Sequence, residues 1–224
     1  MPRLALQIDC RTIFDVGAHT GDITRRFLGE LQKSVVYSFE ADPRNFRRLK
    51  SAFDGDERVR AVHAAVSSQP GTAAFHLGAN DYTSSLFPRG DEMRRYCHSQ
   101  YTMVDTVTVP MITLDNFCRD YGIEQIDVLK IDTQGAELDI LRGAEHILDA
   151  SKIQIIVTEF FFIQHYKGAP LLDEIWGLLR RHKYEIYDLF KGPHGSNGQA
   201  RFGDAIFVSS RFRHSILDSR PAEP

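Results

Sequence analysis

The architecture of this chain follows from one stretch, Thr12-Ile13-Phe14-Asp15-Val16-Gly17-Ala18-His19-Thr20-Gly21. Its first half is a β-branched and aromatic run that predicts a strand over 12–16, and a helix is expected over 20–32. Between them, Gly17 permits a tight turn and close backbone approach, and Gly21 lets the helix pack near the sheet. Such a strand–loop–helix unit places a ligand at the helix N-terminus, where the parallel strands of an open α/β sheet end.

Strands and helices alternate along the rest of the chain. Further strands are expected at 35–39, 59–66, 72–77, 126–131 and 153–158, and further helices from residue 43, at 113–121, at 137–148 and at 171–181. The last two strands, 184–189 and 204–208, are separated by a glycine-rich turn with no helix, so we expect the last strand to run antiparallel to the others. The pattern predicts a Rossmann-like α/β fold: a mainly parallel seven-stranded sheet with helices on both faces and an antiparallel C-terminal strand pair.

The length of 224 residues suits a single domain over 1–224. Within it we expect a cofactor-binding half at 12–66 and a catalytic half with the C-terminal hairpin at 107–210. Residues 78–106 have weak periodicity and are expected to form an inserted loop or lid. Residues 211–224 are expected to form a tail.

Composition narrows the classes of function. Hydrophobic residues make up 42% and charged residues 25%, and the formal charge of -3 argues against strong attraction to nucleic acid or an anionic membrane. No apolar run approaches the ~20 residues that span a bilayer. The three cysteines show neither a disulfide framework nor a metal-ligand spacing, which favours a reducing, cytoplasmic location.

The second strand ends in a carboxylate, in Phe39-Glu40-Ala41-Asp42-Pro43. An acid at this position can accept both ribose hydroxyls of an adenosine group, in NAD or in S-adenosylmethionine (SAM). NAD loops read Gly-x-Gly-x-x-Gly and cradle a diphosphate, whereas this loop has Ala18-His19-Thr20 between its glycines. Together with the C-terminal strand pair, this loop favours SAM and the class I methyltransferase fold.

The chain resembles the FkbM methyltransferase family over residues 12–190. The pieces that carry the resemblance occur in order: Phe14-Asp15-Val16-Gly17-Ala18-His19-Thr20-Gly21, Tyr37-Ser38-Phe39-Glu40-Ala41-Asp42-Pro43, Ser84-Ser85-Leu86, Thr113-Leu114-Asp115 and Ile126-Asp127-Val128-Leu129-Lys130-Ile131-Asp132-Thr133-Gln134-Gly135-Ala136-Glu137. The resemblance implies SAM-dependent methyl transfer, typically to a hydroxyl of a sugar, glycan or natural-product intermediate. The cofactor-binding residues that it implies are Asp15, Gly17, Ala18, His19, Gly21, Glu40, Ala65 (beside the adenine) and Asp132.

Two positions depart from the family pattern. His19 stands where the family often has Asn, and Thr133-Gln134 replaces the more usual Val-Glu. The second change removes a carboxylate beside the expected active site, so a metal or base role at position 134 is in doubt.

Three residues are candidates for catalysis. Asp132 ends the fourth strand of the sheet and Glu159 ends the fifth, so both are expected to point into the crevice near the transferred methyl group. A hydroxyl acceptor benefits from a nearby base, and His165, just past the fifth strand, is our first choice as general base. The alternative role for Asp132 is a structural clamp of the loop. Asp132, Glu159 and His165 could also form an oxygen-rich site for a divalent metal, which no motif spacing supports, so metal binding stays unknown.

Other functions fit parts of the pattern. N-methyl transfer needs a neutral amine more than a strong base, and a non-catalytic SAM-binding module or scaffold would keep the cofactor site without turnover. A nicotinamide-dependent dehydrogenase is opposed by the loop and by the C-terminal strands. The expected partner is a small-molecule or glycan acceptor, with no nucleic acid and no membrane, and a homodimer stays open.

Overall fold

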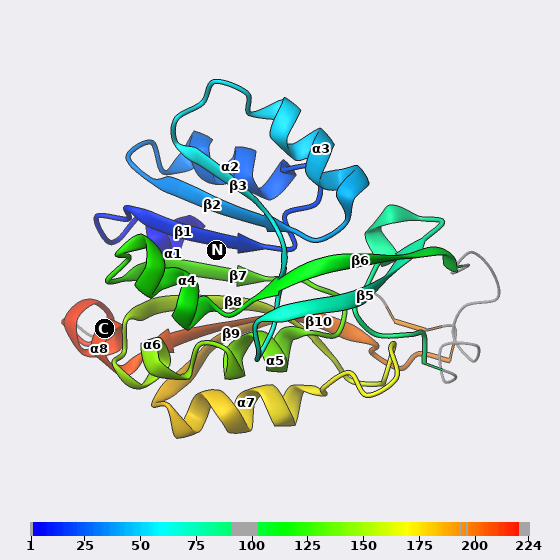
Figure 1. Cartoon of the computed structure of the whole chain (residues 1–224). Coiled ribbons are helices and arrows are strands. Elements are labelled where there is room, and N and C mark those ends of the chain that lie inside the picture. The colour runs from blue at the N-terminus through cyan, green and yellow to red at the C-terminus, as the bar shows by residue number, and fades with distance from the viewer. Residues whose placement is uncertain (1, 91–102, 193, 196, 220–224) are drawn as a thin grey trace.

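A twisted seven-stranded sheet forms the centre of the computed structural model, which describes residues 2–90, 103–192, 194–195 and 197–219 (Figure 1). The strand order is β3-β2-β1-β7-β8-β10-β9. The bounds are Thr12–Val16 (β1), Val35–Glu40 (β2), Val59–His63 (β3), Ile126–Ile131 (β7), Ile153–Phe161 (β8), Tyr184–Lys191 (β9) and Phe202–Ser209 (β10). Strand β10 pairs antiparallel with both β8 and β9, while β1, β2, β3, β7 and β8 pair in parallel. The predicted class I methyltransferase sheet is confirmed.

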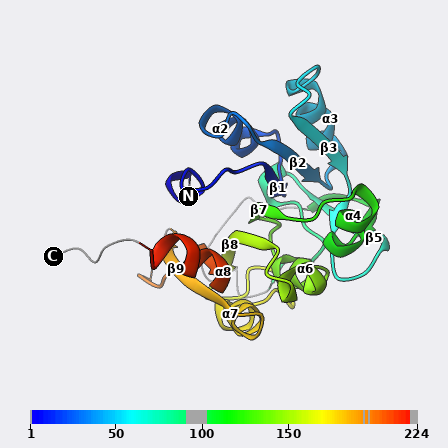
Figure 2. The same ribbon diagram turned by 90° about the vertical axis from the view of Figure 1, so that its left-hand side faces the viewer.

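Helices cover both faces of this sheet, as the alternation predicted. Helices α1, α2 and α8 pack on one face, and α4 to α7 pack on the other; Figure 2 shows α2 and α8 on the side opposite to α4 and α6. The bounds are Pro2–Ala5 (α1), Asp22–Glu30 (α2), Pro43–Ala52 (α3), Leu114–Tyr121 (α4), Glu137–Arg142 (α5), Glu145–Asp149 (α6), Leu172–Arg181 (α7) and Ser210–Phe212 (α8). None of the described helices is long and apolar enough to cross a bilayer.

Alternating side chains of the central strands build two separate cores. In β1, Ile13 joins the core under α2 and α8, whereas its neighbour Phe14 joins the core under α4 to α7. Both side chains have 0% exposure. Successive residues of a strand point to opposite faces, so a central strand with helices on both sides must be apolar throughout. The continuous apolar runs in the sequence therefore marked the central strands correctly.

A second, three-stranded sheet, which the sequence did not predict, lies beside the first. Its order is β4-β6-β5, with bounds Ala65–Val66, Met103–Ile112 and Gly71–Gly78. The single strand expected over 59–66 is wrong, because the chain leaves the large sheet after His63 and pairs with β6 instead. The first residues of β6, 103–106, belong to the segment 78–106 that was expected to form a loop or lid. Most side chains of β6 are exposed or half-buried, so its apolar pattern is weak.

The helix expected over 137–148 is also wrong, because it is divided into α5 and α6 at Gly143. A Cβ at Gly143 would lie 2.1 Å from the backbone oxygen of Ser67, so the chain passes here in direct contact with another segment. The carbonyl of Gly143 accepts a hydrogen bond from Asp115 N at 2.9 Å instead of continuing the helix. At the C-terminal end, residues 210–217 of the expected tail region are helical, and Phe212 is buried. Residues 91–102 and 220–224 lie outside the described part of the chain.

The carboxylate of Asp127 joins three strands at the amino edge of the large sheet. Asp127 Oδ2 accepts hydrogen bonds from the backbone N–H groups of Arg11 and Thr12 at 2.7 and 2.9 Å. Its Oδ1 accepts from the amides of Gln125 and Gln154 at 2.7 and 2.6 Å. The residue is 3% exposed, so these four donors replace the water that the charge would otherwise bind.

We expect Asp127→Ala to lower the free energy of unfolding by about 3 kcal/mol, since it removes charged hydrogen bonds and leaves buried donors unpaired. Urea denaturation followed by circular dichroism measures the change. The exposed Asp120→Ala serves as control and should change stability by less than about 0.5 kcal/mol. Equal effects of the two substitutions would contradict the clamp role of Asp127.

Candidate functional site

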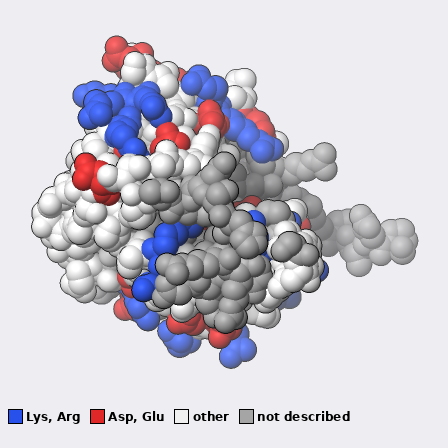
Figure 3. All heavy atoms as spheres, turned by 90° about the vertical axis from the view of Figure 1, so that its right-hand side faces the viewer, with Lys and Arg blue, Asp and Glu red and all other residues white. Residues whose placement is uncertain are grey.

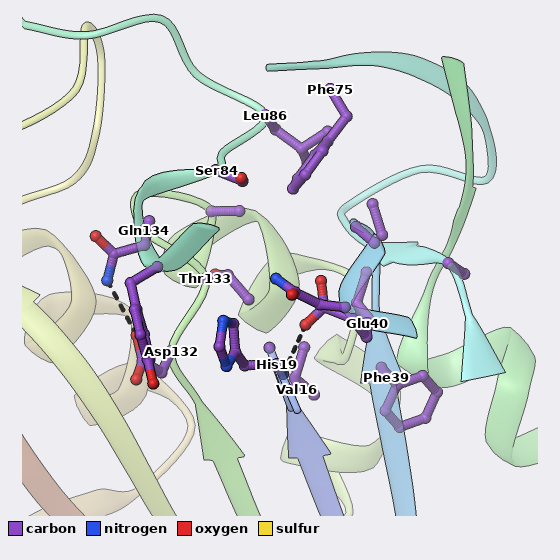
Figure 4. A pocket seen from close by; sticks show the side chains of 18 of the residues that line it. Val16, His19, Phe39, Glu40, Phe75, Ser84, Leu86, Asp132, Thr133 and Gln134 are labelled. Carbon is purple, nitrogen blue, oxygen red and sulfur yellow. Dashed lines mark hydrogen bonds between the residues drawn. The ribbon is translucent and has the colours of Figure 1, made fainter. Parts of the chain in front are cut away.

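A pocket of about 160 Å³ opens where the parallel strands end, the place where open α/β sheets bind small molecules. Figure 4 shows Asp132 and Gln134 on the left of it and Glu40 on the right, with His19 between Asp132 and Glu40. Phe75 and Leu86 lie at the top of the view. The residues that line it are Val16, Gly17, His19, Phe39, Glu40, Ala41, Asn45, Ala64, Ala65, Val66, Phe75, Asp81, Tyr82, Ser84, Leu86, Asp132, Thr133, Gln134 and Ala136. Of the predicted site residues, five meet here: Gly17, His19, Glu40, Ala65 and Asp132.

The two glycines of the loop are required by close contacts. Gly17 has φ +77°, and a Cβ there would lie 1.9 Å from the backbone oxygen of Asp132. Gly21 has φ +91°, and its Cβ would lie 2.3 Å from the ring of Phe53 in the segment that follows α3. Glycine alone adopts these angles readily, and no side chain has room at either position. Gly21 therefore shapes the packing behind the cavity, whereas Gly17 brings the loop against the end of β7.

A buried lysine that the motif analysis did not single out holds this loop. Lys130 Nζ donates to the backbone oxygen of Gly17 at 3.0 Å and lies 3.2 Å from Asp15 Oδ1 and 3.8 Å from Asp132 Oδ2. Burial acts to lower the pKa of Lys130, but Asp15 and Asp132 outweigh burial and raise it. A lysine within the largely apolar strand 126–131 was the signal available in the sequence, because lysine is almost never buried without a partner.

Asp15 lies beneath the loop and does not line the cavity. Its exposure is 0%, and Oδ2 accepts a hydrogen bond from Thr24 Oγ1 at 2.8 Å. Ala18 and Gly21 likewise belong to the loop without lining the cavity wall. Both oxygens of Asp15 thus lie beside groups of the protein itself, the Thr24 hydroxyl and the Lys130 ammonium.

Glu40 sits at the end of β2 with both carboxylate oxygens on backbone amides. Oε2 accepts from His19 N and Oε1 from Asp42 N, each at 2.7 Å. Burial raises the pKa of Glu40 to about 7, although the two N–H groups act in the opposite direction. Glu40 therefore ionises near neutral pH at the cavity wall.

Asp81, Tyr82 and Ser84, which follow β5, form a wall of the cavity over the glycine loop. The Tyr82 ring stacks on the His19 ring with centroids 4.1 Å apart, and His19 Nε2 lies 3.3 Å from Asp81 Oδ1. Ser84 Oγ donates to Asp42 Oδ2 at 3.1 Å, which ties the wall to the start of α3. The resemblance to a known family pointed to Ser84, but nothing in the sequence pattern indicated the stacking of Tyr82 on His19.

The face of the molecule at this edge of the sheet is seen in Figure 3, where Lys and Arg side chains gather at the top, at the height of α3 in Figure 1. Helix α3 carries Arg44, Arg47 and Arg48. Arg44 pairs with Asp42 and Arg48 with Asp81, at 2.6 and 2.7 Å. The acidic residues beside the cavity thus neutralise part of this basic group.

The opposite side of the cavity carries two carboxylates joined by an amide. Gln134 Nε2 donates to Asp132 Oδ1 at 3.1 Å and to Glu159 Oε2 at 2.9 Å. The side chain of Asp132 is 45% exposed, whereas Glu159 is buried behind the cavity wall. Burial, with the nearby Asp132, Glu137 and Asp204 carboxylates, raises the pKa of Glu159 well above its ordinary value.

Glu137 orders the loop that carries Gln134. Its carboxylate accepts from the backbone N–H groups of Thr133 and Gly135 at 3.0 Å each, and its exposure is 0%. Gln134 within this loop has φ +60°, a conformation that costs a non-glycine residue about 1–3 kcal/mol. The hydrogen bonds of Glu137 and of the Gln134 side chain hold the chain in this conformation.

The structure does not bring His165 to the cavity wall. Its ring packs against Phe161 and Phe202, with centroids 4.6 and 5.6 Å away, and its exposure is 6%. Within the described residues, His165 Nε2 is buried with no hydrogen-bond partner. Burial, with Arg201 and Arg89, lowers the pKa of His165 to about 4, so the ring is neutral at physiological pH. Its role as general base stays a prediction.

The candidate metal site of Asp132, Glu159 and His165 is not assembled. The amide of Gln134 lies between the two carboxylates, and the ring of His165 is held among aromatic side chains. In the described ranges of the chain, no three His, Cys, Asp or Glu side chains are grouped to hold a metal ion. The residues present therefore do not fit a metal centre here.

The chain is similar in sequence to known methyltransferases. The family model described as the methyltransferase FkbM domain matches residues 15–186. The 2-O-methyltransferase NoeI of Sinorhizobium fredii is 31% identical, over 83% of this chain and 76% of its own length. The AMB antimetabolite synthetase AmbE of Pseudomonas aeruginosa is 36% identical over 94% of this chain, which spans 11% of that relative.

A solved structure shares the fold. The methyltransferase FkbM from Methylobacillus flagellatus superimposes with a TM-score of 0.57 at 14% identity, covering 89% of this chain and 44% of that one. The family match spans most of the chain and includes the loop, Glu40 and Asp132. The chain therefore belongs to the FkbM family of methyltransferases.

Proposed function

We propose that the cavity binds SAM and that the chain transfers its methyl group to a hydroxyl oxygen of a small-molecule or glycan acceptor. The observation that carries the proposal is the placement of two carboxylates in one cavity, Glu40 at the end of β2 and Asp132 at the end of β7. The first suits a ribose, and the second suits the reacting end of the cofactor and its acceptor.

The cavity offers a distinct partner for each part of SAM. Glu40 would accept the ribose hydroxyls. Ala65, Phe75 and Leu86 form an apolar region suited to an adenine ring. The loop at Gly17, packed on the end of β7, would face the amino-acid part of the cofactor. The methyl group would then lie toward Asp132 and Gln134.

Methyl transfer needs alignment and removal of one proton. When bound, SAM supplies an electrophilic methyl carbon on a sulfonium; the new oxygen–carbon bond forms as the carbon–sulfur bond breaks. Holding both reactants in line provides much of the rate. The acceptor hydroxyl loses its proton, and Asp132 is the carboxylate placed to orient or accept it, because its side chain is exposed at the cavity wall.

Sequence similarity to NoeI and the carboxylate of Asp132 both support a hydroxyl acceptor. NoeI is named a 2-O-methyltransferase, and this chain is 31% identical to it. A carboxylate at the reacting end suits a hydroxyl, which must lose a proton, more than a neutral amine, which can attack directly. N-methyl transfer is therefore the second candidate.

Isothermal titration calorimetry tests the cofactor assignment. We expect SAM and S-adenosylhomocysteine to bind with micromolar affinity, about -8 kcal/mol, and NAD not to bind. Glu40→Ala should weaken SAM binding about 10- to 100-fold, because it removes a charged hydrogen-bond acceptor. The exposed Glu124→Ala is the matched control and should bind like the wild type. Folded protein that binds neither compound would overturn the methyltransferase activity and favour a scaffold role.

Cofactor affinity should rise with pH through neutrality. Because the pKa of Glu40 is about 7 in the free protein, ionised Glu40 becomes available for the ribose hydroxyls as the pH rises. We expect SAM to bind about tenfold more tightly at pH 8 than at pH 6, a dependence that Glu40→Gln should remove. Stability should show the opposite sign: a carboxyl pKa raised by folding stabilises the protein below about pH 4.5, and this contribution is lost as the pH rises to about 7. A pH-independent SAM affinity in the wild type would contradict the assignment.

Substitutions at the reacting end should separate binding from chemistry. With an acceptor identified by transfer of a radiolabelled methyl group to a panel of sugars and hydroxylated metabolites, Asp132→Asn should lower kcat about 100- to 10,000-fold. SAM affinity should change little, because Glu40 and the apolar region are unaltered. His165→Gln in parallel decides whether the buried histidine takes part. Unchanged kcat in Asp132→Asn would remove Asp132 from the mechanism.

A further inference from the structure

The side chain of Gln134 uses all of its polar groups at the reacting end of the cavity. Its Nε2 donates one hydrogen to Asp132 Oδ1 at 3.1 Å and the other to Glu159 Oε2 at 2.9 Å. Its Oε1 accepts a hydrogen bond from Tyr166 Oη at 2.9 Å. The amide therefore has one orientation in which all three contacts are satisfied.

The two carboxylates come from neighbouring strands and need a donor between them. Asp132 follows β7 and Glu159 lies in β8, and the two strands pair in parallel with Ile131 beside Thr158. Two carboxylates that share one hydrogen-bond donor group disfavour each other's ionised forms unless positive charge or hydrogen-bond donors lie between them. Here the donor between them is an uncharged amide.

The backbone of Gln134 is held as firmly as its side chain. Ser85 Oγ donates to the backbone oxygen of Gln134 at 2.7 Å, and Glu137 binds the N–H groups on both sides of it. Tyr166, which holds the amide oxygen, is 1% exposed. The amide thus cannot rotate away from the two carboxylates without losing its hydrogen bond from Tyr166, while Ser85 and Glu137 fix the backbone that carries it.

We propose that Gln134 is a positioning residue whose amide takes the place that a divalent cation would occupy between Asp132 and Glu159, and so directs the second oxygen of Asp132 toward the acceptor. The inference rests on the proposed methyl transfer, since it assigns the role of Asp132 in that reaction. Asp132 Oδ1 is engaged by the amide, Oδ2 lies 3.8 Å from Lys130 Nζ, and the residue lines the cavity.

Gln134→Glu tests this role without a known acceptor. The substitution keeps the size of the side chain and makes three carboxylates converge, a ligand set that suits Mn²⁺. We expect Gln134→Glu to bind Mn²⁺ at least about tenfold more tightly than the wild type, measured by electron paramagnetic resonance. Should the variant have a lower Tm than the wild type, Mn²⁺ is expected to raise it again.

Two control variants locate the gained metal site. Gln164→Glu adds the same charge at an exposed position and should bind Mn²⁺ like the wild type. The double variant Gln134→Glu with Asp132→Asn restores the wild-type charge and exchanges the amide and the carboxylate, so it should lose the gained Mn²⁺ affinity. A Gln134→Glu chain that Mn²⁺ neither binds nor stabilises beyond these controls would overturn the proposal.

A second readout separates this proposal from the proposed function. S-adenosylhomocysteine is titrated into the wild type and into Gln134→Glu, with and without Mn²⁺. A wild type that does not bind it disproves the cofactor assignment, whatever the metal result. A wild type that binds it, beside a Gln134→Glu variant without Mn²⁺ affinity, disproves the role of Gln134 alone. With the acceptor from the panel, Gln134→Met should lower kcat and leave the KM for SAM unchanged; an unchanged kcat also overturns the role.

Discussion

The site depends on the direct contact between the glycine loop and the end of β7. Gly17 touches the backbone oxygen of Asp132 so closely that no side chain fits, and Asp132 N donates to Val16 O at 3.0 Å. Lys130 binds the Gly17 carbonyl and lies beside the carboxylates of Asp15 and Asp132. The glycine loop and Asp132 at the end of β7 are therefore one packed unit.

The carboxylates in and around the cavity differ in the groups that compensate their negative charge. Asp15 has the Lys130 ammonium as its partner. Glu40 has two backbone N–H groups, which offset only part of the cost of burial, so its pKa is about 7. Glu159 is buried near other carboxylates, and its pKa is raised well above the ordinary value. Burial thus raises the pKa of Glu40 at the cavity wall and, together with neighbouring carboxylates, that of the buried Glu159.

Prediction from sequence worked for the central strands of the large sheet and failed at the half-exposed strand β6 and where distant segments pack together. The central strands of the large sheet are largely apolar on both faces, and their continuous apolar runs in the sequence predicted them. Strand β6 is half-exposed and was expected to be a loop up to residue 106. The division of the helix at Gly143 depends on a contact with Ser67, a segment far away in the sequence. Neither feature leaves a periodic signal within a short window of residues.

The sequence by itself determined the alternation of strands and helices that builds the large sheet, the antiparallel end of that sheet, and the placement of the loop, Glu40 and Asp132 at one edge of it. Each depends on local patterns: apolar runs, turn lengths and residues at strand ends. Only the tertiary structure decided that Lys130 holds the loop, that Gln134 joins Asp132 to Glu159, and that His165 packs away from the cavity. These arrangements depend on the register of neighbouring strands and on the course of loops, because they join side chains that are distant in the sequence.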